Sequence, residues 1–437
     1  MVKKLLFLLI TVTLFSLSAI TKTPPSITPD NTKKAAETRQ SQQPCPTPKK
    51  GMTKRELRKI KSCIKRNDPN RMEWAILPVL GFNSDTGFIF GGNVVFAQFD
   101  EKRDLYKWRI ALLGSAAVNS DGISMQNHAA QFDMPQIAGS KWRLQMRAAY
   151  IQVDNKGYYG FGNDAPYIPS DDKDRYTYSV QSPEVWAYTT YTLPKKMSLL
   201  GGLRFRYSLF DFSPSSLLDD HQKVVDIPGT ENHGELIWAF GWNIDTRDDE
   251  TATTSGYFVQ LSTRFSIGPI TGTDYNYGAT SIQGRGFIPV AKEYLVFAGR
   301  VFADIMYGSA PFYEMSIAGA FPYFDMPGGS RGIRGVPEGR YRGPVKLIIN
   351  LEVRSMFIKF NLGSQRFKIG AVAFFDTGRI WMYQKYSYLD GDGMGMKFGV
   401  GGGVRLQWGK TVMVRIDVAY SPDSDPIGFY FDVGHMF

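Results

Sequence analysis

The sequence contains few of the residues on which most enzymes and metal centres depend. Its 437 residues include only two cysteines and four histidines, and the histidines (His128, His221, His233 and His435) stand far apart in the chain. No His-Glu-x-x-His, phosphate-binding loop or cysteine-rich metal spacing occurs. These absences argue against an enzyme, a metal site and a bound cofactor.

Long hydrophobic runs are also missing after the first residues of the chain. No internal stretch approaches the roughly 18 to 20 unbroken apolar residues that a transmembrane helix needs. The N-terminus alone has a basic start (MVKK), an apolar run (LLFLLITVTLF) and small residues that end near Ala19. This order is typical of an export signal, and the run is too short for the alternative, a membrane anchor. We therefore expect residues 1–19 to be a signal peptide.

The two cysteines, Cys45 and Cys63, lie in the part of the chain that we expect to be exported, where oxidation is permitted. They could form a disulfide that closes a small loop, or both could remain free. Neither has a histidine or another cysteine nearby at the spacing of a metal site.

Positive charge is concentrated in one short segment. The formal net charge is +10, and residues 49–66 hold nine lysines and arginines but a single acid, Glu56. The rest of the chain is close to neutral, which makes nucleic acid a poor candidate partner. Residues 20–52 are rich in Thr, Pro, Ser, Lys and Gln, and this composition predicts a disordered linker.

Within the basic segment, residues 53–66 predict a short helix. Thr53 and Glu56 have the spacing of a capping box. One narrow stripe of this helix is apolar and consists of Leu57, Ile60 and Ile64. The helix could be a solvated linker, could rest on anionic headgroups, or could pack against the mouth of a barrel.

From Glu73 to the end, apolar and polar residues alternate with the period of a β-strand, as in LIWAFGWNI (236–244) and KLIINLEVR (346–354). About sixteen such stretches can be counted, with no helical segment between them. A soluble β-sandwich also alternates, but here the apolar face is aromatic, with Trp and Tyr near the strand ends, as the interfaces of a membrane require. The sequence therefore predicts an all-β fold, a transmembrane antiparallel β-barrel over residues 73–437.

The connections between these stretches are of two kinds. The turn LPKK (193–196) is short, whereas residues 212–233 and 309–343 form long connections that we expect to face the cell exterior. The last stretch, GFYFDVGHMF (428–437), is expected to pair with the first, EWAILPVLGF (73–82), because a sheet in hydrocarbon has to close on itself.

An arginine- and glycine-rich stretch ends the second long connection. GGSRGIRGVPEGRYRG (328–343) holds six glycines and four arginines. Its RGIRG core (331–335) resembles the signature of the sixth extracellular loop in the BamA/TamA surface-antigen superfamily, with Val336 in place of the usual aromatic residue. Three further stretches resemble motifs of that family: NIDTRDDETATTSGYFVQLS (243–262), YYGFGND (158–164) and AFFDTGRIW (373–381).

The resemblance implies that this loop folds back into the lumen and is held there by acids. The matching positions are Arg334 and Gly335 in the loop, Glu352 on the next strand and Asp376 in FFDTG. Glu352 and Asp376 both lie on the polar side of their strands, and an arginine fork binds carboxylates bidentately. The alternative is a solvated basic loop that binds lipopolysaccharide. For the last two arginines, Arg340 and Arg342, the sequence does not decide between an anchor and this solvated role.

The resemblance also implies a location and an activity. Members of the family are barrels of the bacterial outer membrane, and their seam between first and last strands is weakly paired. Here the seam would include Pro78, which removes one ladder donor, and the aromatic residues Phe429, Phe431 and Phe437. The expected activity is assistance in the insertion or assembly of outer-membrane proteins, or lipid handling, without covalent chemistry.

The residues before the barrel are too few for the POTRA domains of the family's assembly factors, so we expect a barrel-only member. The expected partners are the outer-membrane lipid bilayer and either client outer-membrane proteins or a periplasmic protein that docks on residues 20–72. Two alternatives remain, because fold does not imply function. One is a pore or transporter, and the other is a structural lipid-homeostasis barrel that acts with a separate periplasmic partner.

Overall fold

The computed structural model describes most of the chain after the predicted linker. The described residues are 46–48, 52–84, 86–101, 106–168, 173–250, 252–291, 294–321, 323–362, 365–408, 412–423 and 427–437. The predicted signal peptide lies outside them, as does most of the predicted linker. Cys63 is disulfide-bonded, whereas Cys45 lies outside the described residues.

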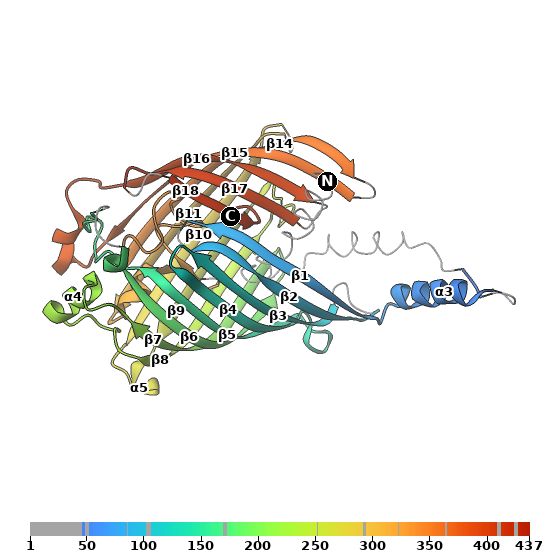
Figure 1. The fold of residues 1–437 in the computed structure, drawn as a ribbon, viewed down its shortest axis with the longest axis horizontal. Helices are drawn as coiled ribbons and strands as arrows, with labels where there is room; N and C mark the ends of the chain where they lie inside the picture. Colours follow the sequence, from blue (N-terminus) through green and yellow to red (C-terminus); the bar gives the residue numbers. More distant parts are fainter. Residues whose placement is uncertain are drawn as a thin grey trace.

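Sixteen strands form one closed antiparallel β-barrel (Figure 1). The barrel strands are β1 Met72–Asn83, β2 Gly87–Phe99, β3 Tyr106–Asn119, β4 Gly122–Met134, β5 Trp142–Gly157, β6 Thr177–Thr192, β7 Met197–Asp211, β8 His233–Asp245, β9 Gly256–Ser266, β10 Tyr277–Pro289, β11 Val296–Gly308, β14 Val345–Leu362, β15 Gln365–Trp381, β16 Lys397–Trp408, β17 Val412–Tyr420 and β18 Ile427–Val433. The short strands β12 (Ile317–Ala318) and β13 (Phe324–Asp325) form a separate sheet inside the connection from β11 to β14. The prediction of a barrel with about sixteen strands is confirmed.

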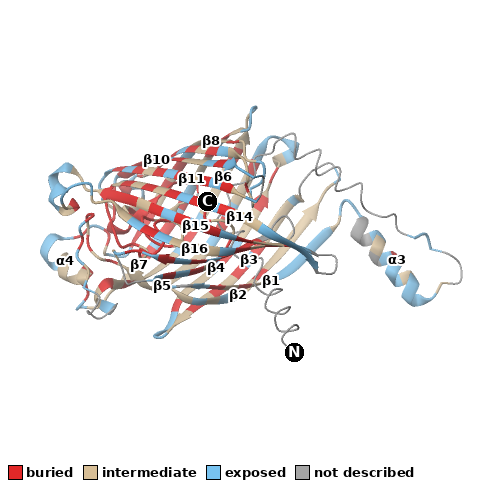
Figure 2. Ribbon diagram, turned by 90° about the horizontal axis from the view of Figure 1, so that it is seen from above, coloured by how far each residue is buried: buried red, intermediate tan, exposed pale blue. Residues whose placement is uncertain are grey.

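Apolar side chains cover the outer wall of the barrel, and polar side chains line its lumen. Leu351 is 52% exposed, whereas its neighbour Glu352 is 2% exposed. Val301 and Arg300 on β11 differ in the same way. Figure 2 shows buried and exposed positions alternating along the strands. This pattern is opposite to that of a soluble protein and is the one expected of a barrel whose outer wall faces lipid.

Among the described residues, helices lie at the two ends of the barrel. Helix α3 (Lys54–Asn67) lies beyond the end at which β1 begins, which we call the α3 end (Figure 1). Helices α4 (Leu217–Val225) and α5 (Gly268–Thr271) lie in connections at the opposite end, which we call the loop end. The described residues also form four short 3-10 turns: Ile137–Gly139, Lys173–Tyr176, Phe312–Ser316 and Gln384–Asp390. None of the described helices is long and apolar enough to cross a membrane.

Helix α4 corrects the prediction that no helix separates the strands. It lies in the long connection 212–233. The helix has only nine residues, which is too short to show a clear helical pattern in the sequence. The side chain of Ser216 accepts a hydrogen bond from the Asp219 amide and caps the helix. A helix this short depends on its tertiary contacts, which sequence periodicity does not reveal.

Helix α3 has the capping box that the sequence predicts. The Thr53 hydroxyl oxygen accepts from the Glu56 amide at 3.3 Å, and the Glu56 carboxylate accepts from the Thr53 amide at 2.8 Å. After the helix, the Phe99 amide donates to the Arg71 carbonyl oxygen at 2.9 Å. This bond ties the entry to β1 to the end of β2.

The seam between β1 and β18 is short. β1 pairs with β2 along its whole length, but it pairs with β18 only at Phe82–Phe431 and Asn83–Tyr430. The prediction that the last strand runs to residue 437 is wrong, because β18 ends at Val433. Gly434 has φ +95°, and its amide donates to the Met413 carbonyl oxygen at 2.6 Å, which redirects the chain.

Phe437 therefore lies inside the lumen rather than in the seam. It packs with Phe287, Val296 and Ala298 on the inner wall. The terminal main-chain oxygen of Phe437 accepts a hydrogen bond from Arg354 at 3.1 Å. Of the other predicted seam residues, Phe429 and Phe431 lie on β18, and Pro78 lies opposite Gly92 in the part of β1 that has no partner on β18.

Candidate functional site

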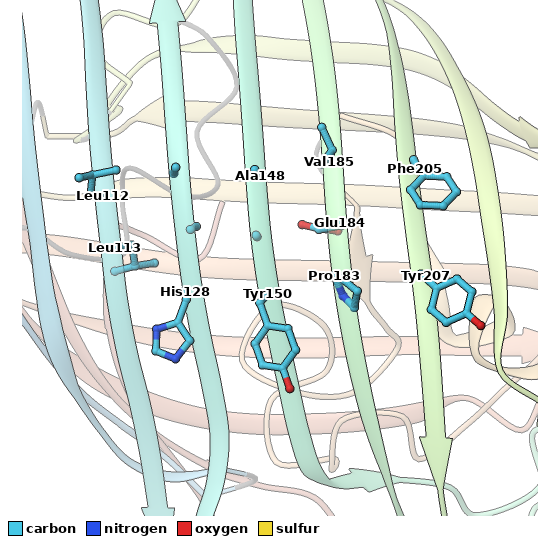
Figure 3. A pocket seen from close by; sticks show the side chains of 13 residues that line it. Leu112, Leu113, His128, Ala148, Tyr150, Pro183, Glu184, Val185, Phe205 and Tyr207 are labelled. Carbon is cyan, nitrogen blue, oxygen red and sulfur yellow. The ribbon is translucent and has the colours of Figure 1, made fainter.

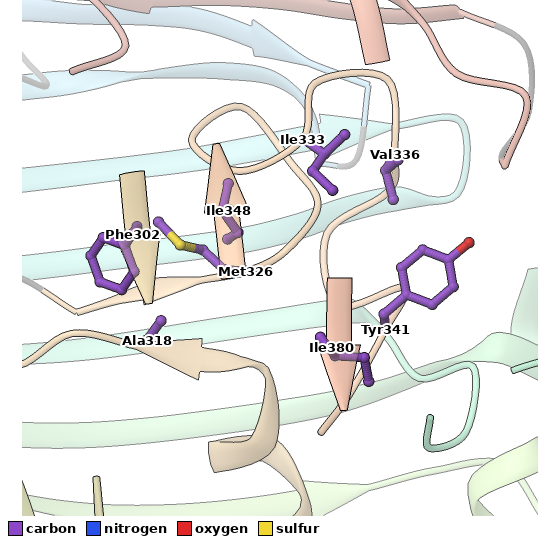
Figure 4. Close-up of a cluster of buried hydrophobic side chains, with 8 residues drawn as sticks. All are labelled: Phe302, Ala318, Met326, Ile333, Val336, Tyr341, Ile348 and Ile380. Atoms are coloured by element: carbon purple, nitrogen blue, oxygen red, sulfur yellow. The ribbon is translucent and has the colours of Figure 1, made fainter. Parts of the chain in front are cut away.

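The long connection from β11 to β14 folds into the lumen and packs against the inner wall. Its apolar residues Ile333 and Val336 are fully buried, together with Ile348 and Ile380 of the wall. In Figure 4, Phe302, Ile348 and Ile380 lie on strand segments, and Ile333 and Val336 lie on the loop. The complete cluster is Phe302, Ala318, Met326, Ile333, Val336, Tyr341, Ile348 and Ile380. The loop is therefore a packed plug, and its hydrophobic contacts bring its arginines against the wall.

Arg334 stands at the centre of this plug with no exposed surface. Its Nε and Nη2 atoms donate to the two carboxylate oxygens of Asp376 at 2.7 and 3.0 Å. Its Nη1 atom donates to Glu352 at 2.8 Å and to Asp417 at 3.2 Å. The guanidinium also lies 3.4 Å from the centre of the Phe374 ring. The structure thus places Arg334 with both predicted acids, and it adds Asp417, which the sequence prediction did not include.

Two glycines allow this close approach. Gly335 has φ +94°, a conformation that other residues rarely adopt, and its amide donates to the Tyr430 hydroxyl at 3.0 Å. On the wall, a Cβ atom at Gly399 would lie 1.9 Å from the Arg334 carbonyl oxygen. The loop backbone therefore rests directly on the backbone of β16.

Substitution of Gly399 by alanine is expected to displace the loop at its anchor. The added methyl group cannot fit without a shift of the Arg334 backbone, so we expect a loss of about 1–3 kcal/mol in unfolding free energy. Urea unfolding of the purified barrel measures this loss. Gly286→Ala is the matched control, since a Cβ there meets nothing within 4 Å. Equal losses for both variants would contradict the close approach.

The other arginines of the stretch are also engaged. Arg342 is fully buried, and its Nη1 atom donates to the Ser316 hydroxyl at 3.3 Å. Arg340 donates to the Ala165 carbonyl oxygen at 2.7 Å. Arg331 is the most accessible, with a side chain 23% exposed and 3.9 Å from Asp432. For Arg340 and Arg342, which the sequence left open, the contacts are those of anchors.

The YYGFGND motif (158–164) meets the loop from another wall. The Gly162 amide donates to the Arg342 carbonyl oxygen at 2.9 Å, which forms an isolated bridge. The Asn163 side chain donates to the Gly395 carbonyl oxygen at 2.7 Å. The motif therefore joins the plug to the connection between β15 and β16.

A second anchor, which the sequence prediction missed, holds the other end of the plug. Glu314 of the loop is fully buried and accepts from Arg206 of β7 at 2.6 Å. Arg264 of β9 donates to it at 3.4 Å, and Arg204 lies at 3.8 Å. Glu235 shares Arg206 with Glu314. The sequence did contain a feature that points to this anchor. Glu314 is the one acid between residues 309 and 324, and the three arginines lie on the lumen side of their strands.

The plug is thus held by charges of opposite sign at its two ends. Arg334 meets acids on β14, β15 and β17, whereas Glu314 meets arginines on β7 and β9. Breaking a buried pair by removal of one partner costs about 3–5 kcal/mol, because the other charge stays buried. Both anchors therefore hold the loop in place more firmly than surface ion pairs would.

The Asp-Thr-Arg-Asp motif forms a turn at the α3 end, between β8 and β9. Asp248 accepts hydrogen bonds from the amides of Asp249, Thr254 and Ser255 at 3.0–3.1 Å. Burial raises the pKa of Asp248, but these hydrogen bonds and one from the Thr254 hydroxyl outweigh it, so the pKa is lowered. The carboxylate therefore stabilises the turn in its charged form.

Residues 328–332 match the Gly-x-Ser-x-Gly sequence pattern, although other enzyme motifs are missing. That pattern marks a nucleophile where it joins a strand to a helix. Residues 328–332 instead lie in the plug, and the Ser330 carbonyl oxygen accepts from Arg415 at 3.1 Å. Among the described residues, no group of three or more His, Cys, Asp or Glu side chains could hold a metal ion.

A depression of about 590 Å³ lies on the wall formed by β3 to β7 (Figure 3). Its rim includes Leu112, Val185 and Phe205, which point outward and are exposed. Glu184, which also borders it, faces the lumen and is bound by Arg147 at 2.8 Å. The exposed lining is apolar, so this depression suits hydrocarbon chains better than a polar substrate.

These features define a transmembrane β-barrel with its own loop packed and anchored inside the lumen. The Omp85 superfamily domain matches residues 114–437, and the chain belongs to the Omp85 superfamily. The family that the sequence resemblance indicated is confirmed.

Two solved structures share the fold. BamA from Haemophilus ducreyi lacking POTRA domains 1–3 superposes with a TM-score of 0.55 at 14% identity, over 91% of this chain and 81% of that chain. CdiB from Escherichia coli superposes with a TM-score of 0.52 at 13% identity, over 86% of this chain and 70% of that chain. At such identities the likeness concerns the fold alone. No curated protein matches the sequence.

Proposed function

We propose that the protein assists the insertion or assembly of other outer-membrane proteins, or handles lipid, through the seam between β1 and β18. The main support is the contrast between the two edges of β1, which has twelve register pairs with β2 but two with β18. Unpaired backbone groups are costly in hydrocarbon, so an open edge favours pairing with an incoming strand. Pro78 lies in this open part and has no amide hydrogen to offer.

The proposal includes a location and an orientation. The barrel would lie in the bacterial outer membrane, with the α3 end in the periplasm and the long connections outside. It would act without a cofactor and without covalent chemistry. The seam, rather than the plugged lumen, would be the place where a client strand or a lipid meets the protein.

A disulfide across the seam tests this proposal. Phe82 and Phe431 are register partners. Directly opposed residues of an antiparallel pair have Cα atoms about 4.5–5.5 Å apart, a separation that a disulfide can span. In a cysteine-free background, the oxidised F82C/F431C variant should lose its ability to speed the folding of another barrel into vesicles. Reduction should restore that ability.

The matched control is a disulfide between β1 and β2, which pair along the whole length of β1. Leu80 and Phe90 are register partners in β1 and β2, so oxidised L80C/F90C should remain active. If the locked seam works as well as the reduced protein, the insertion proposal is wrong. Unchanged insertion with altered lipid distribution would select lipid handling instead.

A second candidate is a barrel that works with a separate periplasmic partner. Helix α3 supports it, because it lies beyond the barrel and five of its basic side chains are exposed: Lys54, Arg55, Arg58, Lys59 and Lys61. Deletion of residues 20–72 should then abolish function in cells but leave activity in vesicles unchanged. The anchored plug favours both of these candidates over a passive pore.

A further inference from the structure

Two arginines face each other on the inner wall with no carboxylate between them. Arg285 of β10 and Arg300 of β11 are register partners, and both point into the lumen. Directly opposed side chains of an antiparallel pair stand roughly 4.5–5.5 Å apart at Cβ, and like charges there destabilise the sheet. Arg405 and Arg415 form a similar pair, but Asp417 lies within 2.5 and 3.4 Å of them.

The contacts of Arg285 are all with neutral groups. Its Nε and Nη2 atoms donate to the Gln283 side-chain oxygen at 3.3 and 3.0 Å. Its guanidinium lies 5.1 Å from the centre of the Phe258 ring, and Arg247 lies at the same distance from that ring. Arg247 binds Asp245 through two hydrogen bonds, so this acid is already occupied. Among the described residues, Arg285 forms no ion pair.

Arg300 is buried, and its donors also meet neutral acceptors. Its Nε atom donates to the Asn350 side-chain oxygen at 2.9 Å, and its Nη2 atom donates to the Arg331 carbonyl oxygen. The acids of this wall serve other arginines: Asp376 binds Arg334, and Glu352 binds Arg334 and Arg354. In the part of the chain that the structure describes, Arg300 too lacks an acidic partner.

Arg331 adds a third positive charge from the plug. It is 3.9 Å from Asp432, which Arg415 binds more closely at 2.8 Å. The side chain of Arg331 is 23% exposed, and Arg285 is partly exposed, so solvent in the lumen reaches this group of cations. Among the described residues, none of these three arginines has a carboxylate to itself, so this part of the wall carries a local excess of positive charge.

We propose that Arg285 and Arg300, with Arg331 beside them, form a binding site for a phosphate-type anion inside the lumen. Guanidinium forks match the oxygens of phosphate, and one tetrahedral dianion can accept hydrogen bonds from two of them. Binding replaces a repulsion between opposed arginines with two attractions. The phosphate is either a free ion or the headgroup of a lipid, and the two sources share this chemistry.

Unfolding of the full-length protein tests the site. In detergent, inorganic phosphate should raise the urea midpoint of the natural protein relative to chloride at equal ionic strength. Arg285→Gln should raise the midpoint in chloride, because the opposed charge is gone, and should weaken the apparent phosphate affinity at least tenfold. This opposite sign distinguishes a ligand site from a structural arginine.

Three further measurements complete the test. Arg285→Lys keeps the charge and loses the fork, so it should weaken the phosphate response without raising the midpoint in chloride. Arg175→Gln, at an exposed ion pair near the loop end, should change neither quantity. Vesicles that contain phosphatidic acid, compared with vesicles of uncharged lipid, show whether a headgroup substitutes for free phosphate.

The outcomes are separable. A response to inorganic phosphate or to phosphatidic acid that Arg285→Gln removes supports the site and identifies its source. The proposal is wrong if neither probe stabilises the natural protein, if Arg285→Gln lowers the midpoint in chloride, or if the variant keeps the full response. None of these results depends on activity at the seam.

Discussion

Arg334→Ala should release the plug and weaken the barrel more than any other single substitution in the loop. The alanine leaves Asp376 buried with Asn350 as its remaining side-chain partner, at 2.8 Å. Glu352 and Asp417 keep other arginines. From the cost of a broken buried pair, we expect a loss of about 3–5 kcal/mol in unfolding free energy. Urea unfolding measures the loss, and protease cleavage of the loop together with ion conductance measures its release.

Three variants make this prediction specific. Arg334→Lys keeps the charge but not the fork, so it should fall between the natural protein and the alanine variant. The double variant R334A/D376A should lose less than the sum of the single losses, because the orphaned carboxylate is removed. Arg331→Ala, in the same loop with a weak and partly exposed pair, should lose less than about 1 kcal/mol. A solvated loop would make Arg334 and Arg331 equivalent.

Glu314→Gln should free the other end of the plug. The amide leaves Arg206 with Glu235 and Arg264 with Asp304, but it leaves Arg204 without its acidic partner. Since two of the three arginines keep a carboxylate, we expect a loss of about 3 kcal/mol, at the lower end for buried pairs. Urea unfolding and protease cleavage measure it as they do for Arg334.

A control and a combination sharpen this second prediction. Glu338→Gln, also in the loop, alters an ion pair with Lys156 whose acid is 33% exposed, and it should have little effect. The combined variant R334A/E314Q should conduct ions far more than either single variant, because both ends of the plug are free. If one single variant conducts as much as the combined variant while the other conducts like the natural protein, one anchor alone holds the loop.

The sequence predicts the barrel well because its signals are local. Period-two alternation assigns each strand and its lumen face, so Glu352 and Asp376 are placed correctly before any contact is known. The loop arginine, in contrast, is identified by the resemblance of the RGIRG core to the family motif. The strand predictions succeed because side-chain direction in a strand depends on position alone.

The missed features depend on contacts between distant residues. Asp417 meets Arg334 across 83 positions, and Glu314 meets Arg206 across 108. Period-two alternation places all these side chains in the lumen, but it does not predict which of the many charged lumen residues form ion pairs with each other. The end of β18 was missed for a different reason, since alternation continues past Gly434 although its backbone turns away.

The opposite charges of the two anchors have a consequence for the order in which the protein folds. The acids that receive Arg334 belong to β14, β15 and β17, near the C-terminal end of the chain, whereas the bases that receive Glu314 belong to β7 and β9. Both sets are present only in a sheet that already extends from β7 to β17. We therefore expect the loop to take its place late, when most of the barrel wall has assembled.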